Sequence, residues 1–191
     1  SCEFQNIDIR ETNQLISAFE KFTPDCVIHF AGLKSVRDSF IYPLEYYDNN
    51  FLGSVSLLKA MDLSECKKII YSSSATVYGE PIHVPLDEKH PCEPVNPYGR
   101  TKLFVEEMLK DWAKTKTQNS AIILRYFNPV GAHSSGLLGE DPSGAPNNLM
   151  PIIADVALGK LPYINIYGQD YSTRDGTGER AVSYTHLRAH E

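Results

Sequence analysis

A tyrosine and a lysine four residues apart can together move a proton. Tyr98 and Lys102 occur in the segment NPYGRTK, and on a helix they would share one face, one turn apart. A lysine ammonium beside a phenol favours the ionised form, so it lowers the phenol pKa from about 10 toward neutral pH. Such a phenol can act as a general base toward an alcohol. Because this spacing is also common on solvated helices, the neighbouring sequence must decide.

A serine cluster supplies the third group of this chemistry. Ser72, Ser73 and Ser74 follow a short apolar run, and one of their hydroxyls could hydrogen bond to the phenol or to the substrate hydroxyl. Taken alone, serines at a strand end are more often turn formers. A serine–tyrosine–lysine set suits removal of a proton from an alcohol while hydride leaves its carbon. That reaction needs a hydride acceptor, and nicotinamide is commonly bound by doubly wound parallel sheets.

Helices and strands alternate along the chain. Apolar residues at helical spacing predict helices over residues 10–22 and 44–61 and from Pro97 onward, the last capped by Asn96 and carrying a core stripe of Phe104, Met108 and Trp112. Buried strands are expected at residues 26–30, 68–71 and 121–126. The strands are continuous apolar runs, as expected when helices cover both faces of a sheet. We therefore predict an α/β fold with a doubly wound, Rossmann-like parallel sheet.

The candidate ligand-binding segments all follow these strands. They are Ala31 to Lys34, Ser72 to Thr76 and Phe127 to Pro129. Ligands of open parallel sheets bind beyond the carboxyl ends of the strands, so the three segments are expected to form one site. Lys34 as a surface lysine and Asn128 as a turn residue are the plainer interpretations. For Arg125, a structural ion pair is favoured over ligand contact.

The character of the sequence changes after residue 130. Residues 131–148 are rich in Gly, Pro, Ser and Asn; a helix is expected over 149–158 and a short strand over 164–167. We interpret this part as the start of a smaller second lobe. The last dozen residues carry no apolar periodicity, and we hypothesise that residues 181–191 come from a non-native junction. No glycine-rich phosphate fingerprint occurs, so the first strand and turn of the sheet are expected upstream of Ser1.

Composition narrows the class of protein. The 191 residues carry a net charge of −6, which argues against a nucleic-acid surface, and no apolar run approaches the ~20 residues of a membrane helix. The four cysteines form no closely spaced pair and the histidines no H-x-x-x-H pair, so no metal site is predicted. Free thiols indicate a cytoplasmic protein, with Cys26 interpreted as a small core residue.

Five segments resemble one family. They are VIHFAGLK from residue 27, YSSSATVYG from 71, NPYGRTK from 96, RYFNPVGAH from 125 and PNNLMP from 146. Together and in this order they resemble the UDP-glucose 4-epimerases of the extended short-chain dehydrogenase/reductase family, from about residue 6 to residue 180. The resemblance implies an NAD-binding Rossmann-like domain over 1–130, incomplete at its N-terminus. It also implies the start of a nucleotide-sugar lobe over 131–180.

The resemblance also implies residue roles. Tyr98 would be the acid/base, Lys102 its partner and Ser74 the third catalytic member. The residues implied to bind NAD are Asp8, Ile9, Phe30, Ala31, Gly32, Lys34, Asn50, Ser72, Tyr98, Lys102 and Phe127. Those implied to bind the UDP-sugar are Ser74, Tyr98, Asn128, Asn148, Leu149, Tyr167 and Arg180. Because the sequence departs from the family after Arg180, that assignment is the weaker one.

The implied activity is interconversion of UDP-glucose and UDP-galactose by transient oxidation at C4 with bound NAD, in a homodimer. One alternative is a 4-epimerase of another UDP-sugar, an N-acetylhexosamine or a pentose. A dehydratase would carry acidic residues after the serines, and Ala75, Thr76 and Val77 are not acidic. A non-catalytic Rossmann-like binding protein would not need the intact Ser, Tyr and Lys. Lacking both ends of the family's chain, these 191 residues alone are expected to turn over little.

Overall fold

A computed structural model of the protein describes residues 3–131, 133, 135–137, 148–179 and 182–184. The chain divides into two compact units, Ser1–Tyr126 and Phe127–Glu191. Tyr98, Lys102 and the serine cluster all lie in the first unit.

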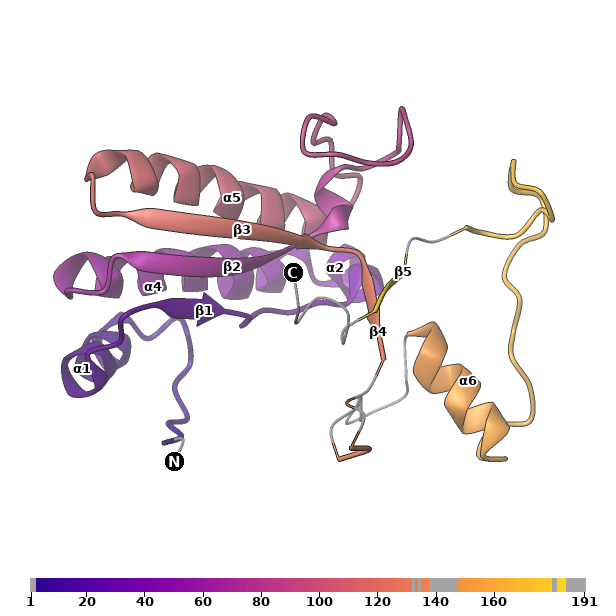
Figure 1. The fold of residues 1–191 in the computed structure, drawn as a ribbon, viewed down its shortest axis with the longest axis horizontal. Helices are drawn as coiled ribbons and strands as arrows, with labels where there is room; N and C mark the ends of the chain where they lie inside the picture. The colour runs from indigo at the N-terminus through magenta and orange to yellow at the C-terminus, as the bar shows by residue number, and fades with distance from the viewer. Residues whose placement is uncertain (1–2, 132, 134, 138–147, 180–181, 185–191) are drawn as a thin grey trace. The chain divides into compact units, whose positions relative to one another are not determined.

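The first unit is built on a three-stranded parallel sheet. Strands β1 (Val27–His29), β2 (Lys68–Ser74) and β3 (Ser120–Tyr126) lie in the order β1-β2-β3 (Figure 1). Strand β2 extends three residues beyond the predicted end, so the serine cluster belongs to the strand itself. The predicted parallel, Rossmann-like α/β fold is confirmed.

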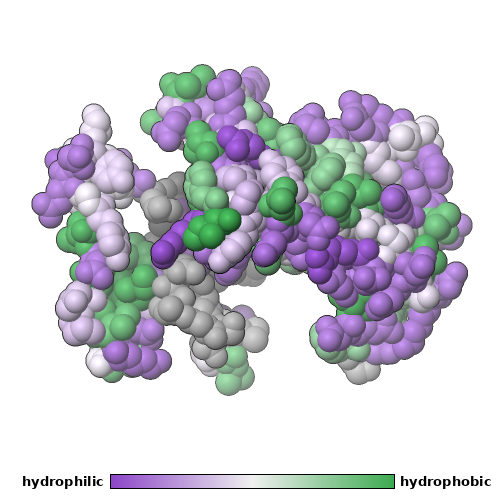
Figure 2. Space-filling view, turned by 180° about the vertical axis from the view of Figure 1, so that it is seen from behind, coloured by the Kyte–Doolittle hydropathy of each residue, from purple (hydrophilic) through white to green (hydrophobic). Residues whose placement is uncertain are grey.

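Helices precede or connect these strands. They are α1 (Thr12–Phe22), α2 (Val36–Ile41), α3 (Pro43–Tyr46), α4 (Gly53–Leu63) and α5 (Pro97–Thr115). In Figure 1, α4 and α5 lie behind the sheet, and α1 packs against α4. The core lies between these helices and the sheet, with Met61, Ile69 and Leu109 almost fully buried. Seen from behind, the helix side presents a largely hydrophilic surface with scattered apolar groups (Figure 2).

Burial alternates along the strands. Ile69 is 2% exposed on the helix side, whereas Ile28 and Ile122 are 60% and 52% exposed. The strand register aligns Ile28, Ile70 and Ile122 in one row across the sheet, which forms an apolar face. The sequence pattern predicted helices on both faces, but the described helices of this unit cover one. The continuous apolar runs therefore reflect a second face that is apolar and that the described helices of this unit leave uncovered.

The helix predicted over residues 44–61 is divided. Helix α3 runs directly into a π-helix at Tyr47–Leu52, which continues into α4. A π-helical turn accommodates an extra residue and commonly occurs at functional sites. Asn50 lies in this turn and is 2% exposed.

Helix α5 begins as predicted and buries a different stripe. The Asn96 side chain accepts a hydrogen bond from the Gly99 N–H at 2.7 Å, and Pro97 is the first helical residue. Val105 and Leu109 are buried with Trp112, whereas Phe104 is 46% exposed. The predicted Phe104–Met108–Trp112 core stripe is therefore wrong at Phe104, because Val105, one residue later, points into the core in its place.

The second unit contains a short parallel pair and one helix. Strand β4 (Asn128–Val130) pairs with β5 (Val182–Tyr184), and α6 covers Leu149–Ala157, where a helix was predicted. The strand predicted over 164–167 is wrong: the chain there is irregular, with Ile166 and Tyr167 66% and 82% exposed. Of the expected non-native segment 181–191, the described part is β5.

Cys26 is exposed, so the prediction that it belongs to the core is wrong. Cys66 is buried, and Cys26, Cys66 and Cys92 are free thiols. Within the described ranges, no helix has the length and apolarity needed to cross a membrane.

Candidate functional site

The sequence-predicted pair lies at the carboxyl end of β2. Tyr98 and Lys102 are 9% and 5% exposed, one turn apart near the start of α5. The Lys102 Nζ donates a hydrogen bond to the Ser72 carbonyl oxygen at 2.8 Å. The same nitrogen lies 4.9 Å from the centre of the Tyr71 ring and 5.7 Å from the centre of the Tyr98 ring. The ammonium is therefore held between strand and phenol in a water-poor environment.

Ser74 joins the strand end to the phenol. Its Oγ accepts a hydrogen bond from the Thr76 N–H at 3.2 Å and lies 3.0 Å from the Thr76 Oγ1, which starts the 3-10 turn Ala75–Val77. The Ser74 side chain also lies near the Tyr98 phenol and acts to lower its pKa. The structure thus brings the three predicted catalytic side chains together.

Burial sets the protonation of this pair. Burial raises the pKa of Tyr98 above its usual value, and the nearby Ser74 side chain acts in the opposite direction. Burial also lowers the pKa of Lys102 to about 8. The expected lowering of the phenol pKa by Lys102 is therefore not found in the protein alone, because desolvation dominates. At pH 7 the arrangement favours a neutral phenol beside an ammonium.

A glycine allows the helix to approach the serine turn. A Cβ at Gly99 would lie 2.8 Å from the Thr76 carbonyl oxygen and 2.9 Å from the Cβ of Pro94. Both neighbours are held by the chain, so a side chain here would push the first turn of α5 away from Ser74. The glycine in the Y-G-x-x-K segment is thus required by close packing.

Asn50 ties the loop after β1 to α5. Its Oδ1 accepts from the Leu33 N–H at 2.7 Å, and its Nδ2 donates to the Leu33 carbonyl at 2.9 Å and to the Thr101 Oγ1 at 3.3 Å. Thr101 in turn donates to the Tyr98 carbonyl at 2.7 Å. Asn50 therefore positions the predicted cofactor loop relative to the tyrosine; its own contact with a cofactor stays a prediction.

The other predicted cofactor residues of the first unit lie near the ends of β1 and α1. Phe30 is 64% exposed, its ring 6.4 Å from that of Tyr126, and Ala31, Gly32 and Lys34 are exposed in the loop that Asn50 holds. Ile9 contacts α4, close to Gly53. Asp8 binds Arg10 at 2.7 Å, and this hydrogen bond lowers the pKa of the Asp8 carboxyl to about 2. Asp8 therefore remains ionised and already paired.

The predicted sugar-nucleotide residues belong mostly to the second unit. Phe127 and Asn128 begin this unit, and Asn128 is the first residue of β4. Asn148 precedes α6, Leu149 begins it at 59% exposure, and Tyr167 is exposed. Arg180 lies outside the described residues. The roles of these residues toward a substrate remain predictions.

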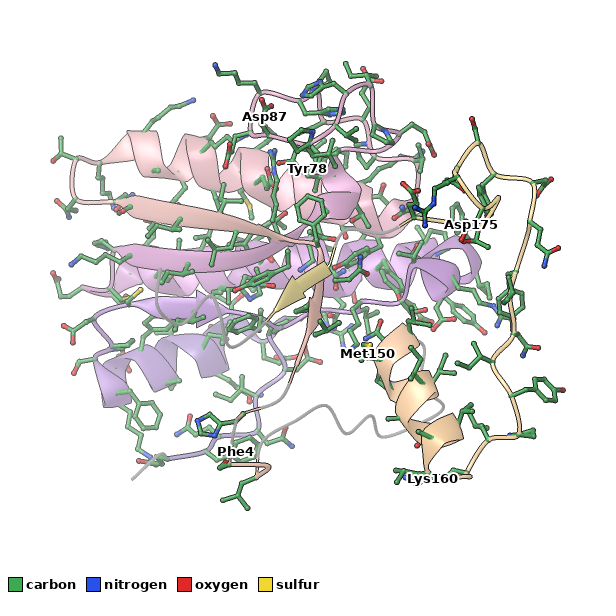
Figure 3. The ribbon with its side chains drawn as sticks, turned by 45° about the vertical axis from the view of Figure 1, so that its right-hand side comes forward. Phe4, Tyr78, Asp87, Met150, Lys160 and Asp175 are labelled. Carbon is green, nitrogen blue, oxygen red and sulfur yellow. The ribbon has the colours of Figure 1, made fainter. Side chains whose placement is uncertain are left out.

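Sequence reasoning missed a buried carboxylate in the site. Glu106 is fully buried, and its Oε1 accepts from the Ser73 hydroxyl at 2.5 Å. Arg125 binds both of its oxygens, at 3.0 and 2.6 Å, which confirms the ion pair favoured for Arg125. The Arg125 guanidinium also lies 4.7 Å from the centre of the ring of Tyr78, a residue labelled in Figure 3. The sequence carried one signal for this role: Glu106 follows Lys102 by four residues, so both lie on the same face of the helix.

These groups fit one half of a dinucleotide. A buried ammonium, a phenol and strand-end hydroxyls suit the nicotinamide and its ribose, which need hydrogen-bond partners at the carboxyl edge of the sheet. A glycine-rich turn for the pyrophosphate does not occur in this sequence. The chain therefore offers the chemical part of a nicotinamide site.

The chain is similar to known UDP-glucose 4-epimerases. UDP-glucose 4-epimerase 2 of Arabidopsis thaliana is 50% identical over 184 residues, 96% of this chain and 52% of that protein. The bifunctional UDP-glucose 4-epimerase and UDP-xylose 4-epimerase 1 of Pisum sativum is 51% identical over 185 residues, 97% of this chain and 52% of that protein. The crystal structure of UDP-glucose 4-epimerase from Bifidobacterium longum in complex with NAD+ and UDP superposes with a TM-score of 0.89. It is 49% identical and covers 94% of this chain and 54% of that one.

The chain thus spans about half the length of the curated relatives it matches. The family model for NAD-dependent epimerases and dehydratases matches residues 1–185. Since this match covers nearly all of the sequence, the chain belongs to the NAD-dependent epimerase/dehydratase family.

Proposed function

We propose that the whole protein interconverts UDP-glucose and UDP-galactose with bound NAD. The observation that carries this proposal is the buried meeting of Ser74, Tyr98 and Lys102 at the carboxyl end of β2. Relatives that bear the name UDP-glucose 4-epimerase, about 50% identical over this region, support the choice of substrate.

In this mechanism Tyr98 removes the proton from the sugar 4-hydroxyl. Its phenol must ionise for this step, and burial opposes ionisation in the protein alone. NAD, when bound, supplies the acceptor and donor of hydride at C4. The Lys102 ammonium and the positive charge of an oxidised nicotinamide both favour the phenolate, which offsets the desolvation. Ser74 orients the hydroxyl, and Tyr98 returns the proton once hydride has reached the other face of C4.

The same proposal assigns the ligand contacts. NAD would contact Asp8, Ile9, the Phe30–Lys34 loop, Asn50 and Phe127. The UDP-sugar would contact Asn128, Asn148, Leu149, Tyr167 and Arg180. We further propose that the enzyme works as a homodimer in the cytoplasm, where its free thiols would stay reduced. These 191 residues alone would turn over little, since no glycine-rich pyrophosphate turn occurs in them.

A second UDP-sugar is the main alternative. The Pisum sativum relative is named for both UDP-glucose and UDP-xylose, so a pentose substrate has specific support. A UDP-N-acetylhexosamine is a further candidate within the same chemistry. A non-catalytic binding protein is disfavoured, because it would not need a lysine ammonium buried beside a phenol at the cost of desolvation.

Replacing Tyr98 by Phe tests the proposal. In the complete protein the Tyr98→Phe variant should lose about 100- to 10,000-fold in kcat with UDP-galactose, the usual contribution of a general acid–base group. Tyr42→Phe is the control: Tyr42 lies between α2 and α3 and is 53% exposed, so loss of its hydroxyl should leave turnover unchanged. Unchanged turnover in Tyr98→Phe would remove Tyr98 from its role, and no turnover of UDP-galactose or UDP-xylose by the wild type would refute the function.

A further inference from the structure

Two consecutive residues near the end of β2 are bonded to two successive turns of α5. The Ser72 carbonyl accepts a hydrogen bond from Lys102, and the Ser73 hydroxyl donates one to Glu106. Lys102 and Glu106 are spaced by four, so they lie along one face of α5, as does Tyr98. The strand end is therefore fixed to the helix by two bonds, and the one between Ser73 and Glu106 involves none of the three predicted catalytic residues.

The bond between Ser73 and Glu106 is the more strongly held of the two. Glu106 is fully buried, so no water can replace Ser73 as a partner of its Oε1. Arg125, whose side chain is 15% exposed, binds both carboxylate oxygens in a bidentate pair. Charge-assisted bonds of this kind are shorter and more directional than neutral ones. Ser73 is itself 3% exposed, so its hydroxyl has a single fixed acceptor.

We propose that Glu106, with Arg125 as its counterion, is a positioning residue for proton transfer at Tyr98 and acts through Ser73. Because Ser73 lies between the Ser72 carbonyl and the Ser74 hydroxyl, its bond to Glu106 sets where both of these groups meet α5. Loss of this bond removes none of the predicted catalytic side chains but releases the strand end that orients them. This inference rests on the proposed function, and its role is separate from contact with NAD or substrate.

Ser73→Ala tests the inference because it removes the link and leaves the Glu106–Arg125 pair intact. In the complete enzyme we expect kcat with UDP-galactose to fall about 10- to 100-fold while KM changes little, as for a small misplacement of reacting groups. Ser73→Thr keeps a donating hydroxyl and suits a strand, so it should restore most of the turnover. Ser39→Ala is the matched control: Ser39 is also fully buried, but its hydroxyl donates to the Val36 carbonyl in α2, at 2.6 Å.

Crystal structures of wild type and Ser73→Ala supply a readout that needs no activity. We expect the Lys102 Nζ to Ser72 carbonyl distance to lengthen from 2.8 Å beyond hydrogen-bond range in the variant. If the distance and kcat stay unchanged, the inference is wrong. Equal losses in Ser73→Ala, Ser73→Thr and Ser39→Ala would also overturn it, since these would report general packing. If the wild type does not turn over UDP-galactose, the proposed function fails, and the distance still decides the inference.

Discussion

Lys102 is a buried charge that should weaken the fold it serves. Burial lowers its pKa from the usual 10.5 to about 8, so the ammonium, although it persists at pH 7, is less favourable in the folded state than in the unfolded state. Each pH unit of this displacement is worth about 1.4 kcal/mol, which makes the cost about 3 kcal/mol. Lys102→Met removes this cost and also loses the hydrogen bond to the Ser72 carbonyl, worth about 1 kcal/mol. The variant should therefore be about 2 kcal/mol more stable at pH 7, and inactive.

The pH dependence gives the sharper form of this prediction. Between pH 8 and 10.5 the unfolded wild type binds more protons at this site than the folded one, so wild-type stability rises with pH across that window. The advantage of Lys102→Met should therefore shrink and disappear near pH ~10. Urea unfolding can be followed by the fluorescence of Trp112, the single tryptophan, which is 7% exposed in the core of the same unit.

A lysine on the same helix serves as the control. Lys114 has 76% of its side chain exposed, so Lys114→Met should change stability little at any pH. A Lys102→Met variant that is less stable than wild type at pH 7 would contradict the reasoning. A stability difference that stays constant from pH 7 to pH 10 would also contradict it, because it would mean that burial does not lower the pKa of Lys102.

Two further predictions concern packing and acid stability. Gly99→Ala should destabilise the fold by about 1–3 kcal/mol through the close contact with Thr76, although alanine favours helices. Gly178→Ala is the control, because a Cβ at Gly178 would meet no atom within 4 Å. Equal thermal midpoints for the two variants would contradict the packing argument. His29 is buried, and burial lowers its pKa to about 4, so stability should fall by up to about 3 kcal/mol as the pH drops from 6.5 to 4. In urea unfolding, His29→Gln should reduce this loss of stability between pH 6.5 and 4, whereas His133→Gln, at an exposed residue, should not. If His29→Gln loses as much stability as the wild type, other groups cause the loss.

Local patterns predicted the parts of the site that depend on local geometry. The four-residue spacing of Tyr98 and Lys102 placed both on one helix face, and the Asn96 cap with Pro97 located the start of that helix. The apolar run before the serines located the strand that meets it. These inferences succeeded because helix periodicity and strand burial are properties of a few consecutive residues.

The missed features depend on contacts between distant segments. Glu106 appeared as one more charge on a helix, since its partner Ser73 is 33 residues away and Arg125 is 19 away. The direction of the Tyr98 pKa shift was misjudged because burial, which spacing does not reveal, outweighs the nearby ammonium. The exposure of Ile28 and Ile122 also follows from which faces the chain covers, which an apolar strand does not specify.

The π-helical turn at Tyr47–Leu52 makes the site sensitive to insertion and deletion rather than to substitution alone. Removing one residue there would close the wide turn to α-helical winding, so α3 and α4 would keep about the same relative rotation while the side chains of the turn itself took new directions. Asn50, which lies in the turn, could then no longer keep its bonds to Leu33 and Thr101. Length in this short segment is thus under a constraint as strict as the identity of the catalytic residues, and single-residue deletions there should be among the least tolerated changes in the chain.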